Sequence, residues 1–384
     1  MGEPSIPPRF EPPHRRLMAP GPSTADIRVR QAMAQPVIGH LDPATGQLLN
    51  EIQAMLRTVF RTDNVLTFPV SGTGTAGMEC ALMNVLEPGE VALLVVGGAF
   101  AERMVEIASR CGAEVQVIGG EWGRPVPDSE VAAALKEHPD AKIVGVVHAE
   151  TSTGVLQPLE GIGELCRDHG AMLVVDAVAS LGGIPVEVDA WGIDVCYSGS
   201  QKCLSVPPGL APITFSERAV HVRTNRATPM HSFYLDVLPI SQYLGSERLY
   251  HHTAPISMLY GLHEGLRMVL EEGLDQRWRR HAELGAELLA ALQERGFDPY
   301  APEGHRLPEV VCGRLPDWVD DKPMRRRLLD EFGIEVAGGL GDLAGKVWRL
   351  GLMGESCTRD NVDAVLSAID VLAASVRSGV SSDA

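Results

Sequence analysis

A series of short apolar runs limits the folds open to this chain more than any other feature of its sequence. Each run is rich in valine and isoleucine and is apolar along nearly its whole length. The runs are residues 91–96, 114–119, 142–150, 171–178, 194–200 and 211–216. Strands that are covered on both faces have this character, whereas half-exposed strands alternate apolar and polar residues. Because helical stretches separate the runs, we predict an α/β fold with a mostly parallel sheet flanked by crossover helices.

The pattern changes in the last third of the chain. Two long helical stretches meet at Gly273, and the second is followed by Gly296, which is placed as a C-terminal cap. A short strand region, a helix, a Gly-rich turn, a second strand and a closing helix come after it. We therefore predict a large domain over residues 23–272 and a smaller α+β domain over residues 273–384, as the length of the chain favours.

The N-terminus has a composition of its own. Residues 1–22 hold seven of the 27 prolines. Proline lacks an amide donor and fixes φ, so this segment cannot form a regular helix. We predict an extended N-terminal arm.

Charge and hydropathy exclude several classes of partner. The formal net charge is -17, whereas nucleic acids and anionic membranes both need a cationic face. A local basic pocket for a small anion stays open. No apolar run reaches the roughly 18 residues that span a bilayer, and the N-terminus lacks the apolar core of a secretory signal. The seven cysteines are scattered and form no CxxC pair, so we expect free thiols in a cytoplasmic protein.

Lys202 and Asp176 are the first candidates for chemistry. Lys202 follows an apolar run in a small polar turn, where a lone lysine is more often a solvated surface residue. Asp176 ends the run AMLVVD, and a carboxylate at the carboxyl end of a buried parallel strand points into the crevice where such sheets bind ligands. Taken alone, Asp176 is explained equally well as the N-cap of the following helix. Pyridoxal 5′-phosphate (PLP) chemistry needs both groups, because an amine bonds the cofactor and a carboxylate stabilises its pyridinium.

A small-residue turn precedes a helix at residues 70–82, VSGTGTAGMECAL. Glycines let a backbone approach a phosphate, and a helix N-terminus presents free amides to it. Neither GxGxxG nor GxxxxGK[ST] occurs in the segment, so it does not indicate a dinucleotide or ATP site. Thr73, Gly74 and Thr75 are the candidate donors, although a plain helix start explains the segment equally well.

An arginine and a pair of histidines late in the chain are two further candidates for binding. Arg349 lies between apolar neighbours in KVWRLGL, where a guanidinium is costly unless it meets an anion. A substrate carboxylate and a structural salt bridge explain it equally well. His251 and His252 are adjacent, so a metal shared between them would need unusual geometry. We expect no metal site.

Taken in order, these motifs resemble a known family. The segments SGTGTAGMEC, HAETSTGVLQPL, VVDAVASLGG, YSGSQK, FYLD with YHHT, and GGLG with GKVWRLGLMG resemble the fold-type I, class V aminotransferases, most closely the alanine–glyoxylate (serine–pyruvate) type. The resemblance runs from about Pro20 to residue 370. It implies PLP as the cofactor, a large PLP-binding domain and a homodimer with shared active sites.

The resemblance also implies a role for each candidate. Lys202 would carry the cofactor and Asp176 would face its pyridinium. Thr73, Gly74, Thr75 and Gln201 resemble the phosphate ligands, and Thr151 the hydroxyl near the cofactor O3′ and the substrate. Phe100 stands where an aromatic ring stacks on the cofactor, a position often held by tryptophan in relatives. Tyr250 and Thr253 resemble the pair that reaches the phosphate of the neighbouring subunit, and Arg349 the residue that binds the substrate carboxylate.

The implied reaction is a ping-pong transfer of an amino group from alanine or serine to glyoxylate. A second reading is (S)-ureidoglycine–glyoxylate aminotransferase, whose subgroup uses a glutamine and an asparagine where this chain has His40 and Phe233. A PLP lyase such as a cysteine desulfurase would need a nucleophilic cysteine on a mobile loop in the second half of the chain. Cys312 lies in an apolar strand, which leaves Cys357, in GESCTRD, as the candidate. The sequence leaves the preferred donor and the physiological direction open.

Overall fold

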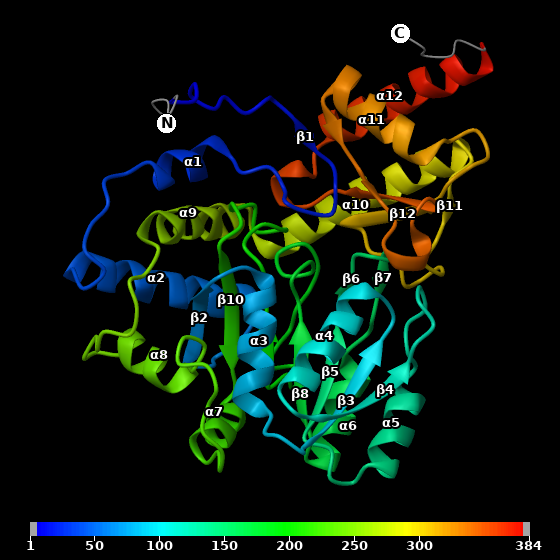
Figure 1. Ribbon diagram of the computed structural model, residues 1–384. Coiled ribbons are helices and arrows are strands. Elements are labelled where there is room, and N and C mark those ends of the chain that lie inside the picture. Colours follow the sequence, from blue (N-terminus) through cyan, green and yellow to red (C-terminus); the bar gives the residue numbers. More distant parts are fainter. Residues whose placement is uncertain (1–5, 379–384) are drawn as a thin grey trace, which may run out of the picture.

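A seven-stranded sheet forms the centre of the larger part of the molecule (Figure 1). The computed structural model describes residues 6–378, so the first five residues of the predicted arm and the last six of the predicted small domain lie outside it. The sheet order is β2-β10-β9-β8-β5-β3-β4. The strands are β2 (Leu66–Ser71), β3 (Val91–Val96), β4 (Glu114–Gly119), β5 (Ile143–Val147), β8 (Met172–Asp176), β9 (Val195–Tyr197) and β10 (Leu210–Phe215). Each of the six predicted runs overlaps one of these strands.

The sheet departs from the prediction in two respects. β10 is antiparallel to both of its neighbours, whereas the other paired strands are parallel. β2 is not among the predicted runs, and it contains Pro69. Proline is tolerated here since β2 is an edge strand, where one row of amides needs no partner.

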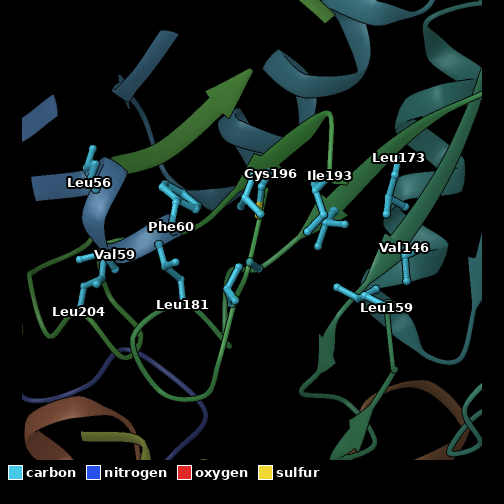
Figure 2. Close-up of a cluster of buried hydrophobic side chains, with 14 of the residues drawn as sticks. Leu56, Val59, Phe60, Val146, Leu159, Leu173, Leu181, Ile193, Cys196 and Leu204 are labelled. Carbon is cyan, nitrogen blue, oxygen red and sulfur yellow. The ribbon is translucent and has the colours of Figure 1, made fainter. Parts of the chain in front are cut away.

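Helices cover both faces of the sheet, as the alternation of side chains along each strand requires. In β3, Leu93 and Val95 join one core cluster, while Leu94 and Val96 join the other. Figure 2 shows part of the first cluster, where Leu56 and Phe60 approach the sheet. The first face is covered by α2 (Pro43–Phe60), α5 (Asp128–Glu137), α6 (Glu160–His169) and α9 (Ile256–Glu272). The second face is covered by α3 (Gly74–Val85), α4 (Ala99–Arg110), α7 (Glu217–Thr224) and α8 (Val237–Leu244).

The C-terminal part is a second, antiparallel sheet with helices packed on it. The sheet order is β11-β12-β15-β14. Its strands are β11 (Asp298–Pro299), β12 (Val310–Arg314), β14 (Ala337–Gly338) and β15 (Val347–Gly351). The helices are α10 (Leu274–Glu294), α11 (Asp321–Phe332) and α12 (Arg359–Arg377), with 3₁₀ turns at Gly341–Leu343 and Gly354–Ser356. The predicted fold class, α/β with a smaller α+β part, is confirmed. Gly273 separates α9 from α10, and the domain boundary placed there stays a prediction.

The N-terminal arm runs along the C-terminal part of the same chain (Figure 1). β1 (Arg16–Leu17) pairs in parallel with β13 (Ile334–Glu335), and the Gly351 amide donates to the Met18 carbonyl at 2.7 Å. The chain then passes the carboxyl edge of the large sheet before α1 (Ile27–Met33) packs on α9. The two short strands β6 (Ala149–Glu150) and β7 (Val155–Leu156) form a hairpin at the same edge. Within residues 6–378, no helix is long and apolar enough to cross a bilayer.

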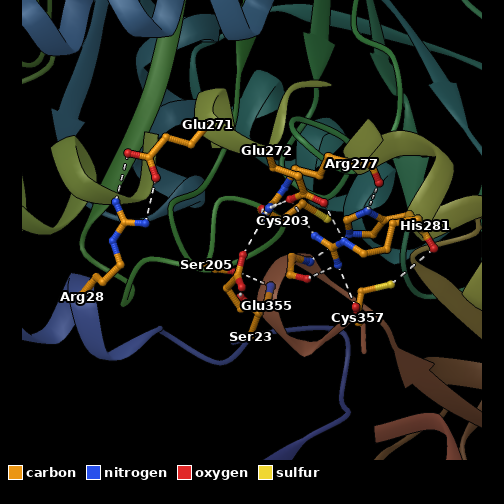
Figure 3. A network of polar contacts seen from close by, with 12 residues as sticks. Ser23, Arg28, Cys203, Ser205, Glu271, Glu272, Arg277, His281, Glu355 and Cys357 are labelled. Atoms are coloured by element: carbon orange, nitrogen blue, oxygen red, sulfur yellow. Dashed lines mark hydrogen bonds and ion pairs between the residues drawn. The ribbon is translucent and has the colours of Figure 1, made fainter. Parts of the chain in front are cut away.

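A buried arginine ties these parts together (Figure 3). Arg277 is 1% exposed. Its Nη1 donates to Glu272 at 2.5 Å and to Glu355 at 3.1 Å, and its Nη2 donates to the Cys203 carbonyl at 2.7 Å. Removing one partner of such a buried charge cluster is strongly destabilising. The cluster therefore fixes the loop that carries residue 203, and with it Lys202, against the C-terminal part.

Candidate active site

One cavity lies where β2, β3, β5, β8 and β9 end. Its volume is about 110 Å³. Eight of the predicted site residues line it: Thr73, Gly74, Thr75, Phe100, Thr151, Asp176, Gln201 and Lys202. The other lining residues are Met78, Arg103, Val147, Ala149, Val178 and Ala179. The carboxyl ends of parallel strands meet at one edge of a sheet, so residues that follow different strands converge there.

Asp176 is the last residue of β8 and is 4% exposed. Its Oδ1 accepts from the Val178 amide at 2.8 Å, and its Oδ2 accepts from the Tyr197 hydroxyl at 2.9 Å. Burial raises the pKa of Asp176 to about 6. Tyr197 lies opposite Asp176 on β9 and is fully buried. It is therefore a positioning residue for the carboxylate that the sequence did not reveal.

Lys202 lies in the turn after β9 and is 9% exposed. Burial lowers the pKa of Lys202 to about 8, so about a tenth of its amine is unprotonated at pH 7, far more than for a solvated lysine. The arm covers this side chain: Nζ contacts the Pro20 carbonyl, and Ser23 Oγ donates to the Lys202 carbonyl at 2.6 Å. Within residues 6–378, no carboxylate forms an ion pair with Lys202. The amine is thus held inside the cavity without a carboxylate of the described residues in direct contact.

The start of α3 forms the opposite side of the cavity. Thr73 is its N-cap, and the Thr73 side chain accepts no amide of its own helix. The amides of Gly74 and Thr75 donate to no acceptor in the described part of the chain. Gln201 Oε1 is buried without a partner there as well. A helix start with two free amides is suited to hold a phosphate, to which the Gln201 side chain can donate only through Nε2.

Glu150 is a second residue that the sequence did not reveal. It is 3% exposed, and its Oε2 accepts from the Phe100 and Ala101 amides at 3.0 and 3.2 Å. Its Oε1 accepts from the Ser152 amide and hydroxyl at 3.0 and 2.6 Å. Burial raises the pKa of Glu150. This one carboxylate caps α4 and fixes the turn after β6, so it positions both Phe100 and Thr151.

Arg349 reaches the site from the C-terminal sheet. It is 8% exposed on β15, and its Nη1 donates to the Thr151 carbonyl at 3.2 Å. Its Nε donates to the Gly338 carbonyl at 2.8 Å. In the described part of the chain, no carboxylate lies within ion-pair distance of this guanidinium. The salt-bridge explanation of Arg349 therefore lacks a partner, although Arg349 does not itself line the cavity.

Comparisons with known proteins agree with this geometry. The family described as "Aminotransferase class-V" matches residues 30–348. The chain belongs to the class-V aminotransferase family.

Its relatives in this family are similar over nearly their full length. (S)-ureidoglycine–glyoxylate transaminase of Bacillus subtilis is 41% identical over 378 residues, covering 94% of this chain and 91% of the relative. Alanine–glyoxylate aminotransferase of Callithrix jacchus is 42% identical over 361 residues, covering 93% and 87%. The crystal structure of alanine–glyoxylate aminotransferase from Nostoc sp. superimposes with a TM-score of 0.94 at 48% identity, covering 96% of this chain and 97% of that one.

Class-V aminotransferases are PLP-dependent, and the cavity fits that cofactor. The free amides of Gly74 and Thr75 suit its phosphate, and the buried Asp176 carboxylate suits a pyridinium. Lys202 supplies an amine for its aldehyde. The predicted PLP ligands that line this cavity are Thr73, Gly74, Thr75, Phe100, Thr151, Asp176, Gln201 and Lys202, and their roles toward PLP stay a prediction. Among residues 6–378, no cluster of three histidine, cysteine or acidic side chains is arranged to hold a metal ion.

Two predicted cofactor ligands of this family member lie outside the cavity. Tyr250 is 61% exposed, and Thr253 is exposed as well. Both lie in the segment between α8 and α9, and neither lines the cavity around Lys202. The Tyr250 ring lies 5.2 Å from the His40 ring. Within one chain, the structure does not bring this pair to the other site residues.

Proposed function

We propose that this class-V aminotransferase transfers the amino group of a small amino acid, alanine or serine, to glyoxylate with PLP as its cofactor. One observation carries the proposal. A buried amine, a buried carboxylate and a helix start with free amides converge in one cavity at the carboxyl edge of the sheet. Two relatives support glyoxylate as the acceptor. One is named for (S)-ureidoglycine and the other for alanine, they are about equally similar to this chain, and both are named as glyoxylate transaminases.

Each residue has a distinct task in this reaction. Bound PLP supplies an aldehyde for the amino group and an electron-poor ring for the charge that develops at the substrate Cα. Lys202 would hold the cofactor through its amine, and that amine, when free, would carry the proton from the substrate Cα to the cofactor C4′. Its lowered pKa suits that task, because the unprotonated amine is the base. Asp176, held by Tyr197, keeps a negative charge beside the ring.

Arg349 is proposed to bind the substrate carboxylate. Its guanidinium is anchored by two backbone carbonyls, Gly338 and Thr151, which fix the direction of its remaining donors. A planar guanidinium binds a carboxylate through two hydrogen bonds, so it would fix the orientation of the Cα–H bond. Through the Thr151 carbonyl, Arg349 also holds the turn that carries Thr151.

(S)-ureidoglycine is the second candidate donor, since a transaminase named for it is comparably similar. The positions predicted to contact a ureido group hold His40 and Phe233. Phe233 stacks on His251 with ring centres 4.8 Å apart, and the ring has no hydrogen-bond donor or acceptor. This favours a donor without a ureido group.

The lyase alternative loses support from burial of its cysteines. Cys357 is 0% exposed and Cys312 is 5% exposed. Burial raises the pKa of Cys357 to about 11 and that of Cys312 to about 12, so neither thiol is a ready nucleophile. Cys312 lies on β12, and Cys357 lies in the packed connection between the 3₁₀ turn Gly354–Ser356 and α12.

A homodimer with shared active sites belongs to the same proposal. Tyr250 and Thr253 are predicted phosphate ligands, yet each is exposed in the single chain. A two-fold interface would place these residues of each subunit at the site of the other.

The test is a donor–acceptor panel on the purified protein. Alanine, serine and (S)-ureidoglycine are offered as donors to glyoxylate and to pyruvate, with keto acid, ammonia and sulfide measured as products. We expect transfer from alanine or serine to glyoxylate and no sulfide.

Borohydride reduction followed by peptide mapping should label Lys202, and Lys202→Ala should abolish the label. A label on Lys142 or Lys346, or ammonia as the main product, would contradict the proposal.

A further inference from the structure

One guanidinium at the mouth of the cavity has no ionic partner. Arg103 lies on α4, one turn after Phe100, and its Nη1 is 3.5 Å from Thr75 Oγ1. Its Cζ lies 4.9 Å from the centre of the Phe100 ring. Arg103 therefore bridges two segments that line the cavity, the start of α3 and the start of α4.

The acidic neighbours of Arg103 are engaged elsewhere. Glu102 accepts from Trp122 Nε1 at 2.9 Å, and Glu106 pairs with Arg110 at 2.7 Å. Glu150 is occupied by amides and by a hydroxyl. Among the described residues, no carboxylate lies within ion-pair distance of Arg103. Its charge is thus available to an anion that occupies the cavity.

The charges of the residues that line the cavity indicate where such an anion would bind. The other groups at the α3 end are neutral: the Gly74 and Thr75 amides, the Thr73 hydroxyl and the Gln201 side chain. Of the residues of the described chain that line the cavity, only Arg103 and Lys202 are cationic. Lys202 is needed for the cofactor aldehyde, and the chain as a whole carries a net charge of -17. A phosphate dianion bound by neutral donors alone would lack a counter-charge.

We propose that Arg103 is the cation that balances the cofactor phosphate, acting beside the amides of Gly74 and Thr75. The inference rests on the proposed use of PLP and assigns one further binding residue to that site. Its chemistry is that of a charge-assisted hydrogen bond from a guanidinium to a phosphate oxygen. The alternative recipient of the same charge is a carboxylate of the substrate, which the experiment distinguishes.

The test compares two ligands that differ only in the phosphate. Apoenzyme of the wild type, Arg103→Gln and Arg103→Lys is titrated with PLP and with pyridoxal, and binding is followed by absorbance. We expect Arg103→Gln to weaken PLP binding about tenfold, the usual loss for one charged hydrogen bond, and to leave pyridoxal binding unchanged. Arg103→Lys should recover part of the affinity for PLP. Arg110→Gln, on the same helix but paired with Glu106, is the matched control and should bind both ligands like the wild type.

Each other outcome overturns the inference in a distinct way. Equal weakening of PLP and pyridoxal would mean that Arg103 acts on the ring through Phe100. Unchanged PLP binding with a raised KM for glyoxylate would assign the charge to the substrate carboxylate. A wild-type protein that binds neither ligand would refute the proposed function itself, and the assignment of Arg103 with it. Thermal melting of the apoenzymes verifies that the exposed Arg103 variants are folded.

Discussion

Among single residues, Arg349 had two possible roles, a structural salt bridge and binding of the substrate carboxylate, and within its described residues the structure offers no partner for the salt bridge. It is buried on β15, hydrogen-bonded to two carbonyls, and without an acidic partner in residues 6–378. We expect Arg349→Ala to raise KM for alanine and glyoxylate and to lower kcat/KM about 10²-fold or more, because a charged hydrogen-bonded pair contributes roughly 3 kcal/mol. Steady-state kinetics with both substrates measures this. Arg314→Ala, on the exposed end of the neighbouring β12, is the control, and unchanged kcat/KM in Arg349→Ala would return Arg349 to a structural role.

Glu309 is a buried carboxyl that the proposed reaction does not use. It is 0% exposed, and neither of its oxygens has a partner in the described part of the chain. Burial raises the pKa of Glu309 from 4.5 to about 8. The folded chain therefore binds this proton more tightly than the unfolded chain does. The resulting stability is complete below pH 4.5 and is lost as the pH rises toward 8.

We therefore expect the free energy of unfolding to fall between pH 5 and pH 8, by on the order of 1.4 kcal/mol per pH unit from this residue. Glu309→Gln cannot ionise and should show a flatter dependence in denaturant titrations. Glu303→Gln, an exposed carboxylate of the same loop, should keep the wild-type slope. Parallel curves for Glu309→Gln and the wild type would show that Glu309 is not the group responsible.

The residues that sequence reasoning missed share one property. Glu150 acts on Phe100 across 50 positions, Tyr197 on Asp176 across 21, and Arg103 on Thr75 across 28. Their roles depend on contacts between segments, and no local pattern marks such contacts. Residues directly after buried strands were predictable, because the end of an apolar run is visible in the sequence and the carboxyl edge of a parallel sheet is where ligands bind.

Among the elements, the strands were predictable to the extent that each carried its own apolar signal. β3, β5 and β8 are buried on both faces and read as continuous apolar runs. β2 carries Pro69, which the pattern excludes from a central strand, and only its position at the edge of the sheet permits it. The reversed direction of β10 was also not predictable, because strand direction is set by the path of the connecting segments rather than by composition.

The arm is an element whose path bears directly on the site. A Cβ on Gly21 would lie 2.5 Å from Lys202 Nζ, and Gly21 has φ +99°. We expect Gly21→Ala to displace either the arm or the Lys202 side chain, and so to lower the rate of borohydride labelling and of transamination about tenfold or more. Labelling kinetics and turnover measure the two effects.

The matched control for this change is Gly120→Ala. Gly120 has φ +113° with nothing within 4 Å of its Cβ position, so the substitution there introduces backbone strain without a contact. It should cost about 1–2 kcal/mol of stability and leave labelling of Lys202 unchanged. Equal activity losses in the two variants would show that strain alone, and not contact with Lys202, limits the Gly21 variant.

At the scale of the whole molecule, one group of exposed aromatic side chains indicates a surface that binds another molecule. Phe233 is 68% exposed and Tyr250 is 61% exposed. The rings of Phe233 and Tyr234 lie against His251, and the Tyr250 ring lies against His40, so these rings come from three segments of the chain. Soluble monomers rarely leave such patches open unless they bind something. The predicted cofactor ligands Tyr250 and Thr253 belong to the same segment, so a second copy of this chain is the partner we propose.

Mixing two inactive variants tests this arrangement. A Lys202→Ala chain lacks the amine, and a Tyr250→Ala/Thr253→Ala chain lacks the contacts that it would lend to its partner. A mixed dimer has one site with both defects and one with neither, so activity should return to about a quarter of the wild-type level when half of the dimers are mixed. Alanine–glyoxylate turnover measures this activity, with mixed dimers verified by native mass spectrometry.

Mixing Lys202→Ala with a chain carrying all three substitutions is the control, because none of its dimers has an intact site. Verified mixed dimers without regained turnover would place Tyr250 and Thr253 at the site of their own subunit, and a fully active monomer would exclude a shared site altogether.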